Sequence, residues 1–360
     1  MADTNATPDA LAPRARDLGL PFPGRPGRWN AITDVPGVRV GFTTLTDPAR
    51  GMRTGVTAIL PRTDAGIAMP VWAGQFSLNG NGEMTGTHWI NDAGYFLGPV
   101  CITNTHAIGA VHHGAVRWMI DTYAAHFAGH AWAMPVVAET YDGVLNDINA
   151  LHVTPDHAIA AINAAASGPV AEGSSGGGNG MIAYEFKGGT GTSSRRVAVG
   201  EGYTVGALVQ ANHGLRPWLT ILGRPIGRLM SEGRLRDREA GSIIVILSTD
   251  APLSGLALRQ LARRAALGVG RGGTPGGNSS GDIFLAFSTA NAMPMPAGPL
   301  VTKVELQEDL LDPLYLGAVE AVEEAVVNAL VAGEDVVTVK PAGMVVRGID
   351  RDRLRAIFAG

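Results

Sequence analysis

The sequence predicts an α/β or layered α+β fold, because short strand-like runs alternate with longer segments that have helix boundaries. Several of the strand-like runs are apolar throughout, which is typical of strands covered on both faces. Hydrophobic residues make up 46% of the 360 residues and charged residues only 17%, a balance that suits one compact, well-buried globular unit.

The strand-like runs are rich in valine, isoleucine and leucine, the residue types that pack well in sheets. They lie at residues 38–42, 56–60, 205–210, 243–247, 283–287 and 336–339. The first 27 residues are rich in proline, arginine and alanine, and we expect them to form an arm over the surface or between subunits.

Three helices are predicted from their boundary residues. The first follows Thr154-Pro155-Asp156, which supplies an N-cap, a first-turn proline and an early acid, and it is expected to close at Gly168. The second is expected over residues 254–267, and the third over residues 314–331, before Gly333.

Composition excludes several classes of function. The net charge of −4, from 28 basic and 32 acidic residues, gives no indication that the protein binds nucleic acid or an anionic membrane. The single cysteine, Cys101, excludes an intrachain disulfide and a thiolate metal cluster. The first residues lack a basic segment followed by an apolar stretch, and no apolar run approaches the ~20 residues that span a bilayer, so we expect a cytoplasmic protein.

Cofactor motifs are missing from the sequence. The glycine-rich residues 173–180 and 188–194 do not match a phosphate-binding loop. We expect them to be tight loops that shape a substrate cleft, with mobile surface loops as the alternative. The adjacent His112 and His113 do not share a face of a helix or strand, and no H-E-x-x-H pattern occurs. His106 and His213 are better explained as structural or surface residues, so we predict no metal and no other cofactor.

The junction Glu239-Ala240-Gly241-Ser242 joins a charged, loop-like stretch to an aliphatic strand-like run. A serine held there could attack the carbonyl of the preceding glycine, cut the chain and become a new N-terminal residue. Its freed α-amino group would have a pKa of about 7.7–8.0, close enough to neutral for a general base. An ordinary loop-to-strand entry is the alternative that the spacing alone leaves open.

A second serine motif, Gly277-Asn278-Ser279-Ser280-Gly281, satisfies G-x-S-x-G. In α/β-hydrolases that motif joins a strand to a following helix, with the serine at the elbow. Here it follows a loop and precedes a strand-like run, so its context is reversed. We therefore reject Ser279 as an elbow nucleophile.

Separate segments along nearly the whole chain resemble the L-aminopeptidase/D-esterase (DmpA-type) and β-peptidyl aminopeptidase family. Many matches in the same order make this a specific signal. They are RARDLGLPF at 14–22, WNAITDVPGV at 29–38, NTH at 104–106, AETYDG at 138–143, GGTGTSSR at 188–195, VQAN at 209–212, GSIIV at 241–245 and SGDIFLAFST at 280–289.

The resemblance implies a four-layer αββα sandwich, cut between Gly241 and Ser242 into an α-subunit (1–241) and a β-subunit (242–360) that begins with the nucleophile. It implies that Ser280 and Asp282 lie beside that nucleophile, although some relatives carry glutamate where this chain has the shorter aspartate. The resemblance also implies that Asn212 and Tyr141 stabilise the oxyanion. Glu139 is the expected binding partner of the substrate ammonium group.

The resemblance also implies the reaction: hydrolysis of the amide or ester bond that follows a small N-terminal residue, through an acyl-enzyme on Ser242. Short peptides and amino acid amides or esters are the implied substrates, with L-alanine or glycine, D-alanine or a β-amino acid at the N-terminus. The implied assembly is a homo-oligomer of processed αβ heterodimers. Two alternatives remain, an ornithine acetyltransferase-like self-processing acyltransferase and a non-catalytic, unprocessed binding protein of the same fold.

Overall fold

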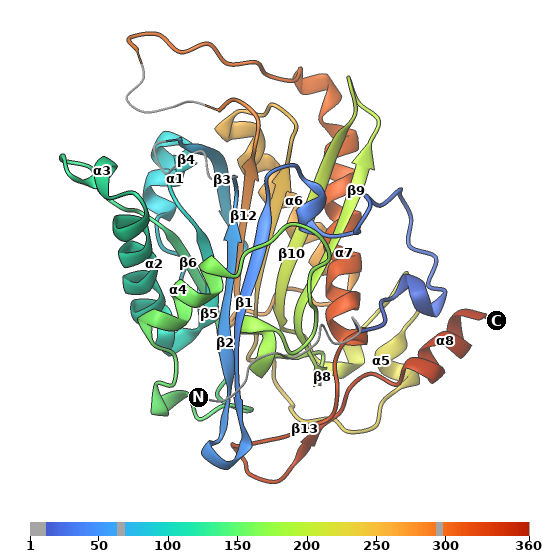
Figure 1. Ribbon diagram of the computed structural model, residues 1–360. Helices are drawn as coiled ribbons and strands as arrows, with labels where there is room; N and C mark the ends of the chain where they lie inside the picture. The colour runs from blue at the N-terminus through green and yellow to red at the C-terminus, as the bar shows by residue number, and fades with distance from the viewer. Residues whose placement is uncertain (1–11, 63–68, 293–297, 360) are drawn as a thin grey trace.

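The computed structural model describes residues 12–62, 69–292 and 298–359 and contains two stacked β-sheets between two layers of helices (Figure 1). Helices α2 (Ile108–Thr122) and α4 (Pro155–Asn163) cover the first sheet, and α6 (Gly255–Arg271) and α7 (Asp312–Val331) cover the second. This arrangement confirms the predicted four-layer αββα sandwich.

The first sheet has four strands in the order β1-β2-β5-β6, and the second has six in the order β4-β3-β12-β11-β10-β9. In the second sheet β11 pairs antiparallel with β10 and parallel with β12. The bounds are β1 Arg39–Asp47, β2 Met52–Leu60, β3 Val71–Ser77, β4 Tyr95–Phe96, β5 Val100–Asn104, β6 Val136–Thr140, β9 Gly189–Val197, β10 Tyr203–Asn212, β11 Ser242–Thr249 and β12 Gly281–Ser288.

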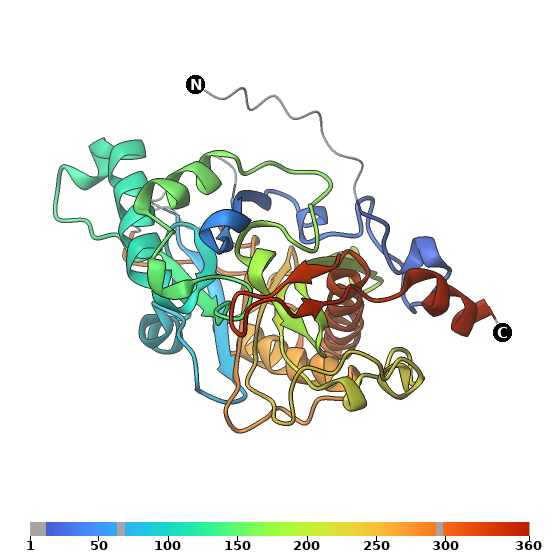
Figure 2. The ribbon, with the colours of Figure 1, turned by 90° about the horizontal axis from the view of Figure 1, so that it is seen from below.

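Smaller elements complete the chain. The view from below shows the pair of short strands β13 and β14 near α7 (Figure 2). The bounds are α1 Thr87–Ala93, α3 Ala124–Phe127, α5 Ile226–Leu229, α8 Arg351–Ala359, β7 Ile182–Ala183, β8 Phe186–Lys187, β13 Val336–Val337 and β14 Val345–Val346. Among the described residues, no helix combines the length and the apolar character that crossing a membrane requires.

Alternation along the strands explains why the predicted runs are apolar on both faces. Ile244 and Ile246 of β11 belong to the core between the two sheets, whereas Ile243 and Val245 belong to the core against α6 and α7. A strand in the middle of four layers is buried on both sides, so the five consecutive residues 243–247 are all apolar. Each of the six predicted strand-like runs overlaps a strand of the structure, although β1 begins one residue after the start of its run and β13 ends at Val337.

The third predicted helix is confirmed as α7, but the first two end elsewhere than expected. Helix α4 ends at Asn163, five residues before Gly168. Helix α6 continues through Gly268 to Arg271. A Cβ atom at Gly268 would lie 2.7 Å from the Cβ of Val322 in α7, so this glycine provides room for helix packing instead of ending the helix.

The prediction that the two glycine-rich stretches are cleft-shaping loops is wrong. Residues 189–194 lie in strand β9, which pairs with β10 along its length. Residues 173–180 are largely buried and include a short 3-10 helix, Gly176–Gly180. Both stretches need small residues because neighbouring main chain approaches closely. A Cβ atom at Gly191 would lie 2.0 Å from the carbonyl oxygen of Ala325 in α7.

The described part of the N-terminal arm, residues 12–27, is fixed to α7 by charge. The Arg16 guanidinium donates to the buried Glu324 carboxylate at 2.8 Å, and Arg195 of β9 donates to the same carboxylate at 2.7 Å. Leu18 and Phe22 of the arm are buried in the core that contains α7. Segments from the two ends of the chain are therefore joined in one unit.

Candidate active site

Ser242 is the first residue of β11 and lies at one end of the second sheet, between the ends of β10 and β12. In the strand register it is opposite Asn212 of β10 on one side and opposite Gly281 of β12 on the other. The Gly281 N–H donates a hydrogen bond to the Ser242 Oγ at 3.1 Å. The serine is 8% exposed, and its side chain is on the face of β11 that looks toward the first sheet.

Gly241 is needed at its position for space. A Cβ atom there would lie 2.1 Å from the carbonyl oxygen of Asn212 and 2.7 Å from the Cα of His213. The peptide bond between residues 241 and 242 is therefore pressed against the end of β10. Any larger residue before the serine would push this bond out of its place beside Asn212.

Ser280 and Asp282 form a hydrogen-bonded pair just before and within β12. The Ser280 hydroxyl donates to Asp282 Oδ1 at 2.5 Å, and both residues are buried. Burial raises the pKa of the Asp282 carboxyl, although hydrogen bonds from Ser280, Asn79 and the main chain of Ile243 act in the opposite direction.

Alternation along β12 places the Asp282 carboxylate on the other face of the sheet from the Ser242 hydroxyl, since Ile283 faces the first sheet. Its contact with the Ile243 main chain brings the carboxylate next to the backbone of the serine. The pair therefore lies against the main chain at the start of β11, the segment that would carry the new N-terminus after a cut.

Asn212 has a buried side-chain amide with two main-chain partners. Its Oδ1 accepts from the Ile182 N–H at 2.9 Å, and its Nδ2 donates to the Tyr141 carbonyl at 3.0 Å. Asn212 thereby fixes the main chain of Tyr141, whose side chain is 45% exposed and lines the cleft beside Ser242.

The cleft at Ser242 has a volume of about 450 Å³ and contains the predicted ammonium-binding residue. Glu139, at the end of β6, is buried in its wall, and its carboxylate accepts from the Glu83 N–H at 3.1 Å and from the Thr105 hydroxyl. Burial raises the pKa of Glu139. The lining is Asn81, Gly82, Glu83, Thr105, Ile108, Glu139, Tyr141, Ala240, Gly241, Ser242 and Ser279.

Sequence reasoning missed two residues that support this site. Asn79, in the loop after β3, hydrogen-bonds to Asp282 through both ends of its amide. Glu239, three residues before Ser242, accepts from the Gly214 N–H at 2.7 Å. Both lie in loops rich in glycine or charge, where Asn and Gly ordinarily predict only a turn.

Neither His106 nor His213, the two histidines singled out in the sequence, is part of the cleft lining. His213 is buried with its ring 5.0 Å from that of Tyr184, and burial lowers its pKa to about 3. His106 is exposed in the 3-10 helix Thr105–Ala107, which precedes α2, and its charge acts to lower the pKa of Glu139 in the cleft. Within the described ranges, no group of three or more His, Cys, Asp or Glu residues could hold a metal ion.

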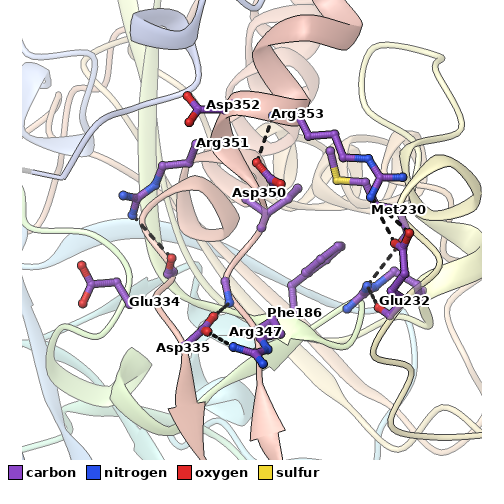
Figure 3. Close-up of a pocket in the computed structure, with 14 residues that line it drawn as sticks. Phe186, Met230, Glu232, Glu334, Asp335, Arg347, Asp350, Arg351, Asp352 and Arg353 are labelled. Atoms are coloured by element: carbon purple, nitrogen blue, oxygen red, sulfur yellow. Dashed lines mark hydrogen bonds and ion pairs between the residues drawn. The ribbon is translucent and has the colours of Figure 1, made fainter.

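A second hollow of about 510 Å³ lies near α8, where charged side chains face one another (Figure 3). Arg347 pairs with Asp335, and Arg353 pairs with Glu232 at 3.2 Å. The Arg216 guanidinium stacks over the Phe186 ring, 3.2 Å from its centre. Ion pairs and stacking satisfy these charges, so we assign the chemistry to the cleft at Ser242.

Comparison with known proteins places the chain in a family. The model of peptidase family S58 matches residues 30–342. A beta-peptidyl aminopeptidase BapA from Sphingosinicella microcystinivorans is 49% identical, over 97% of this chain and 92% of that protein. Uncharacterised aminopeptidases from mycobacteria are 27–28% identical over 85% of this chain.

Solved structures of similar proteins share the whole fold. The L-aminopeptidase D-Ala-esterase/amidase from Ochrobactrum anthropi, described as a variant of the Ntn hydrolase fold, is 56% identical with a TM-score of 0.92. The beta-aminopeptidase from Burkholderia sp. is 46% identical with a TM-score of 0.88. In both cases the match covers 96% of this chain and 98% of the other.

These relatives support the aminopeptidase prediction over the acyltransferase and the non-catalytic alternatives. The chain belongs to peptidase family S58 and is a serine-type aminopeptidase.

Proposed function

We propose that the chain first cuts itself between Gly241 and Ser242. The Ser242 Oγ attacks the Gly241 carbonyl carbon, and the C–N bond breaks as the acyl group moves to oxygen. Water then hydrolyses the ester, which leaves a carboxylate on residues 1–241 and a free α-amino group on residues 242–360. The Gly281 N–H, 3.1 Å from the Oγ, and the closely packed Gly241 support this step.

Turnover uses the same hydroxyl on an external substrate. The Ser242 α-amino group takes the hydroxyl proton, the Oγ attacks the carbonyl that follows the substrate's first residue, and the amine or alcohol leaves with a proton. Water then releases the acyl group. The Tyr141 hydroxyl and the Asn212 amide are the proposed oxyanion donors, and Ser280 with Asp282 holds the α-amino group.

The substrate's own ammonium group is proposed to bind Glu139. This carboxylate faces the cleft that contains Ser242 and is already oriented by Thr105 and Glu83. The relatives' names indicate the substrates to test: beta-peptides, and L-amino acid or D-alanine amides and esters. We propose short peptides and amino acid derivatives with a small first residue as substrates of this chain.

Assembly belongs to the same proposal. The two fragments would stay together as one αβ unit, and such units would form a homo-oligomer. The predicted cytoplasmic location stays a prediction.

The observation that carries the proposal is the position of Ser242 between Asn212 and Gly281, in one cleft with Glu139 and Tyr141. Denaturing gel electrophoresis should show two fragments, with Ser242 as a new N-terminal residue in sequencing. The preparation should hydrolyse Ala-, D-Ala- or β-Ala-p-nitroanilide, and Ser242→Ala should remain a single inactive chain of 37.3 kDa. An uncut wild-type chain, or full activity in Ser242→Ala, would refute the proposal.

A further inference from the structure

The loop between β3 and α1 is hydrogen-bonded to the segment that carries Ser280 and Asp282. The Leu78 N–H donates to the Asp282 carbonyl at 2.9 Å, and the Asn81 N–H donates to the Ser280 carbonyl at 3.3 Å. The Asn81 side chain adds a hydrogen bond to the Ser279 carbonyl at 2.6 Å. These contacts hold the two segments together through their main chains.

Asn79, in the middle of this loop, makes a different kind of contact, because it reaches the carboxylate. Its Oδ1 accepts from the Asp282 N–H at 2.7 Å, and its Nδ2 donates to Asp282 Oδ2 at 3.2 Å. The same Nδ2 also donates to the Gly277 carbonyl at 2.9 Å. One amide therefore holds both the main chain and the side chain of Asp282.

The two carboxylate oxygens of Asp282 have separate partners. Oδ1 accepts from the Ser280 hydroxyl, and Oδ2 accepts from Asn79. Rotation of the carboxylate would lose at least one of these hydrogen bonds. Asn79 thus fixes the plane in which the Ser280 hydroxyl is held.

We infer that Asn79 is a positioning residue that sets the orientation and the charge of Asp282 and, through it, the hydroxyl of Ser280. This inference rests on the proposed function, in which that pair holds the Ser242 α-amino group. Asn79 acts through Asp282 and has no proposed contact with substrate.

Charged groups around Asp282 make the Asn79 donor important. Glu239 of the segment before Ser242 and Tyr184 of the β7–β8 turn both experience the charge of Asp282. The Glu239 carboxylate opposes ionisation of Asp282, and burial does so as well. Hydrogen bonds from Asn79 and Ser280, the main chain of Ile243 and, after a cut, the Ser242 ammonium favour the ionised form.

The test compares three variants across pH. Asn79→Ala removes both contacts with Asp282. Asn79→Asp keeps an acceptor for the Asp282 N–H but replaces the donor by a second carboxylate. Leu78→Ala is the matched control, because Leu78 is an exposed residue of the same loop, is not part of the cleft lining and keeps its main-chain hydrogen bond to Asp282 when its side chain is shortened. The processed proteins are assayed for kcat and KM with Ala-p-nitroanilide from pH 5 to 9.

The expected result is a fall in kcat of about tenfold to a hundredfold in Asn79→Ala with KM little changed, since a hydrogen bond to a charged group is lost. The acid limb of the kcat profile should move to higher pH in Asn79→Ala and further in Asn79→Asp, because a less stabilised carboxylate takes up its proton at higher pH. Leu78→Ala should keep the acid limb of the wild-type profile.

The inference would be overturned if the acid limb of the kcat profile lay at the wild-type pH in both Asn79 variants, even if their activity or melting temperature fell. If an Asn79 variant remains uncut, the rate at which the two fragments appear is measured instead. At least tenfold slower cutting than in Leu78→Ala supports the role of Asn79, and equal rates refute it. A wild-type chain that neither cuts nor hydrolyses the substrate would show instead that the proposed function itself is wrong.

Discussion

At the scale of single residues, the Glu139 carboxylate gives a direct test of substrate binding. Glu139→Gln keeps the shape of the side chain and its contacts with Thr105 and Glu83 but removes the charge. We expect KM for Ala-p-nitroanilide to rise by about tenfold to a hundredfold, with a smaller effect on kcat. The control is Glu83→Gln, an exposed carboxylate at the same cleft, which should change KM by less than about threefold.

The pH dependence of substrate binding follows from the same residue. Burial raises the pKa of Glu139, so its carboxylate takes up a proton at a higher pH than an ordinary glutamate. KM should therefore rise as the pH falls through that raised pKa and should be pH-independent over this range in Glu139→Gln. A substrate ester that lacks the amino group should show neither effect.

Lys187 gives a second prediction at this scale, for stability. It is fully buried, its ammonium donates to the carbonyls of Gly178 and Gly188, and burial lowers its pKa to about 7. Because the unfolded chain keeps a lysine pKa near 10, it binds more protons than the folded chain between these values. Lys187 should therefore make the stability fall by about 1.4 kcal/mol for each unit of pH decrease between about pH 10 and pH 7.

Urea unfolding of wild type and Lys187→Met at pH 7, 8 and 9 measures this contribution. The difference in the free energy of unfolding between the two proteins should change with pH at that slope, in favour of the methionine variant at lower pH. Parallel pH profiles for both proteins would contradict the prediction.

At the scale of elements, helix α6 contains a matched pair of glycines. A Cβ atom at Gly268 would meet Val322 of α7 at 2.7 Å, whereas one at Gly270 meets no described atom within 4 Å. Gly268→Ala should destabilise the protein by roughly 1–3 kcal/mol through overpacking. Gly270→Ala should be neutral or stabilise it by up to about 1 kcal/mol, because alanine favours the helix. Denaturant midpoints of the two variants decide between these outcomes.

The segment before Ser242 gives a prediction about the cut. Glu239 accepts from the Gly214 N–H at 2.7 Å and from the Thr274 hydroxyl at 3.4 Å, so it joins the loop after β10 to the loop before β12. Glu239→Ala should slow self-cleavage by about tenfold, while kcat/KM of the fragments, once formed, should stay near wild type. The control is Arg238→Ala, at an exposed neighbouring position. Equal cutting rates in both variants would contradict the prediction.

How far the sequence predicts these elements depends on their packing. The β-branched runs of β10, β11 and β12 were recognised because central strands of a four-layer fold are apolar on both faces. Strand β9 was not recognised as a strand, because it carries Gly191 at the point where α7 approaches. It also carries serine and threonine residues whose hydroxyls donate hydrogen bonds to buried main-chain carbonyls, as Ser193 does to Ala321. Such a strand has the composition of a loop.

The residues of the candidate site also differ in how far the sequence predicts them. Ser242, Asn212 and Asp282 occupy ends of recognisable strands, and the family resemblance supplied their expected roles. Asn79 and Glu239 lie in irregular loops, and their contacts are with residues about 200 and 25 positions away. No local pattern records such a contact, because it depends on how the two segments meet after the sheets have formed.

At the scale of the whole molecule, the proposed cut should leave the two fragments firmly associated. Strand β11 of residues 242–360 pairs along its length with β10 of residues 1–241, and β12 pairs with β3. The Arg16 and Arg195 contacts with Glu324 also cross between the fragments. Both fragments should elute together in size-exclusion chromatography and separate only in denaturant. Separation under native conditions would contradict this.

The place of β11 in its sheet also determines that folding must precede the proposed self-cleavage. The strand that starts at Ser242 is already inserted between neighbours from both sides of the cut. The bond at its start meets Asn212 and Gly281 only once that insertion is complete. A newly made chain would thus have no peptidase activity until it has finished folding. Only polypeptides that have reached the native state would acquire a mature active site.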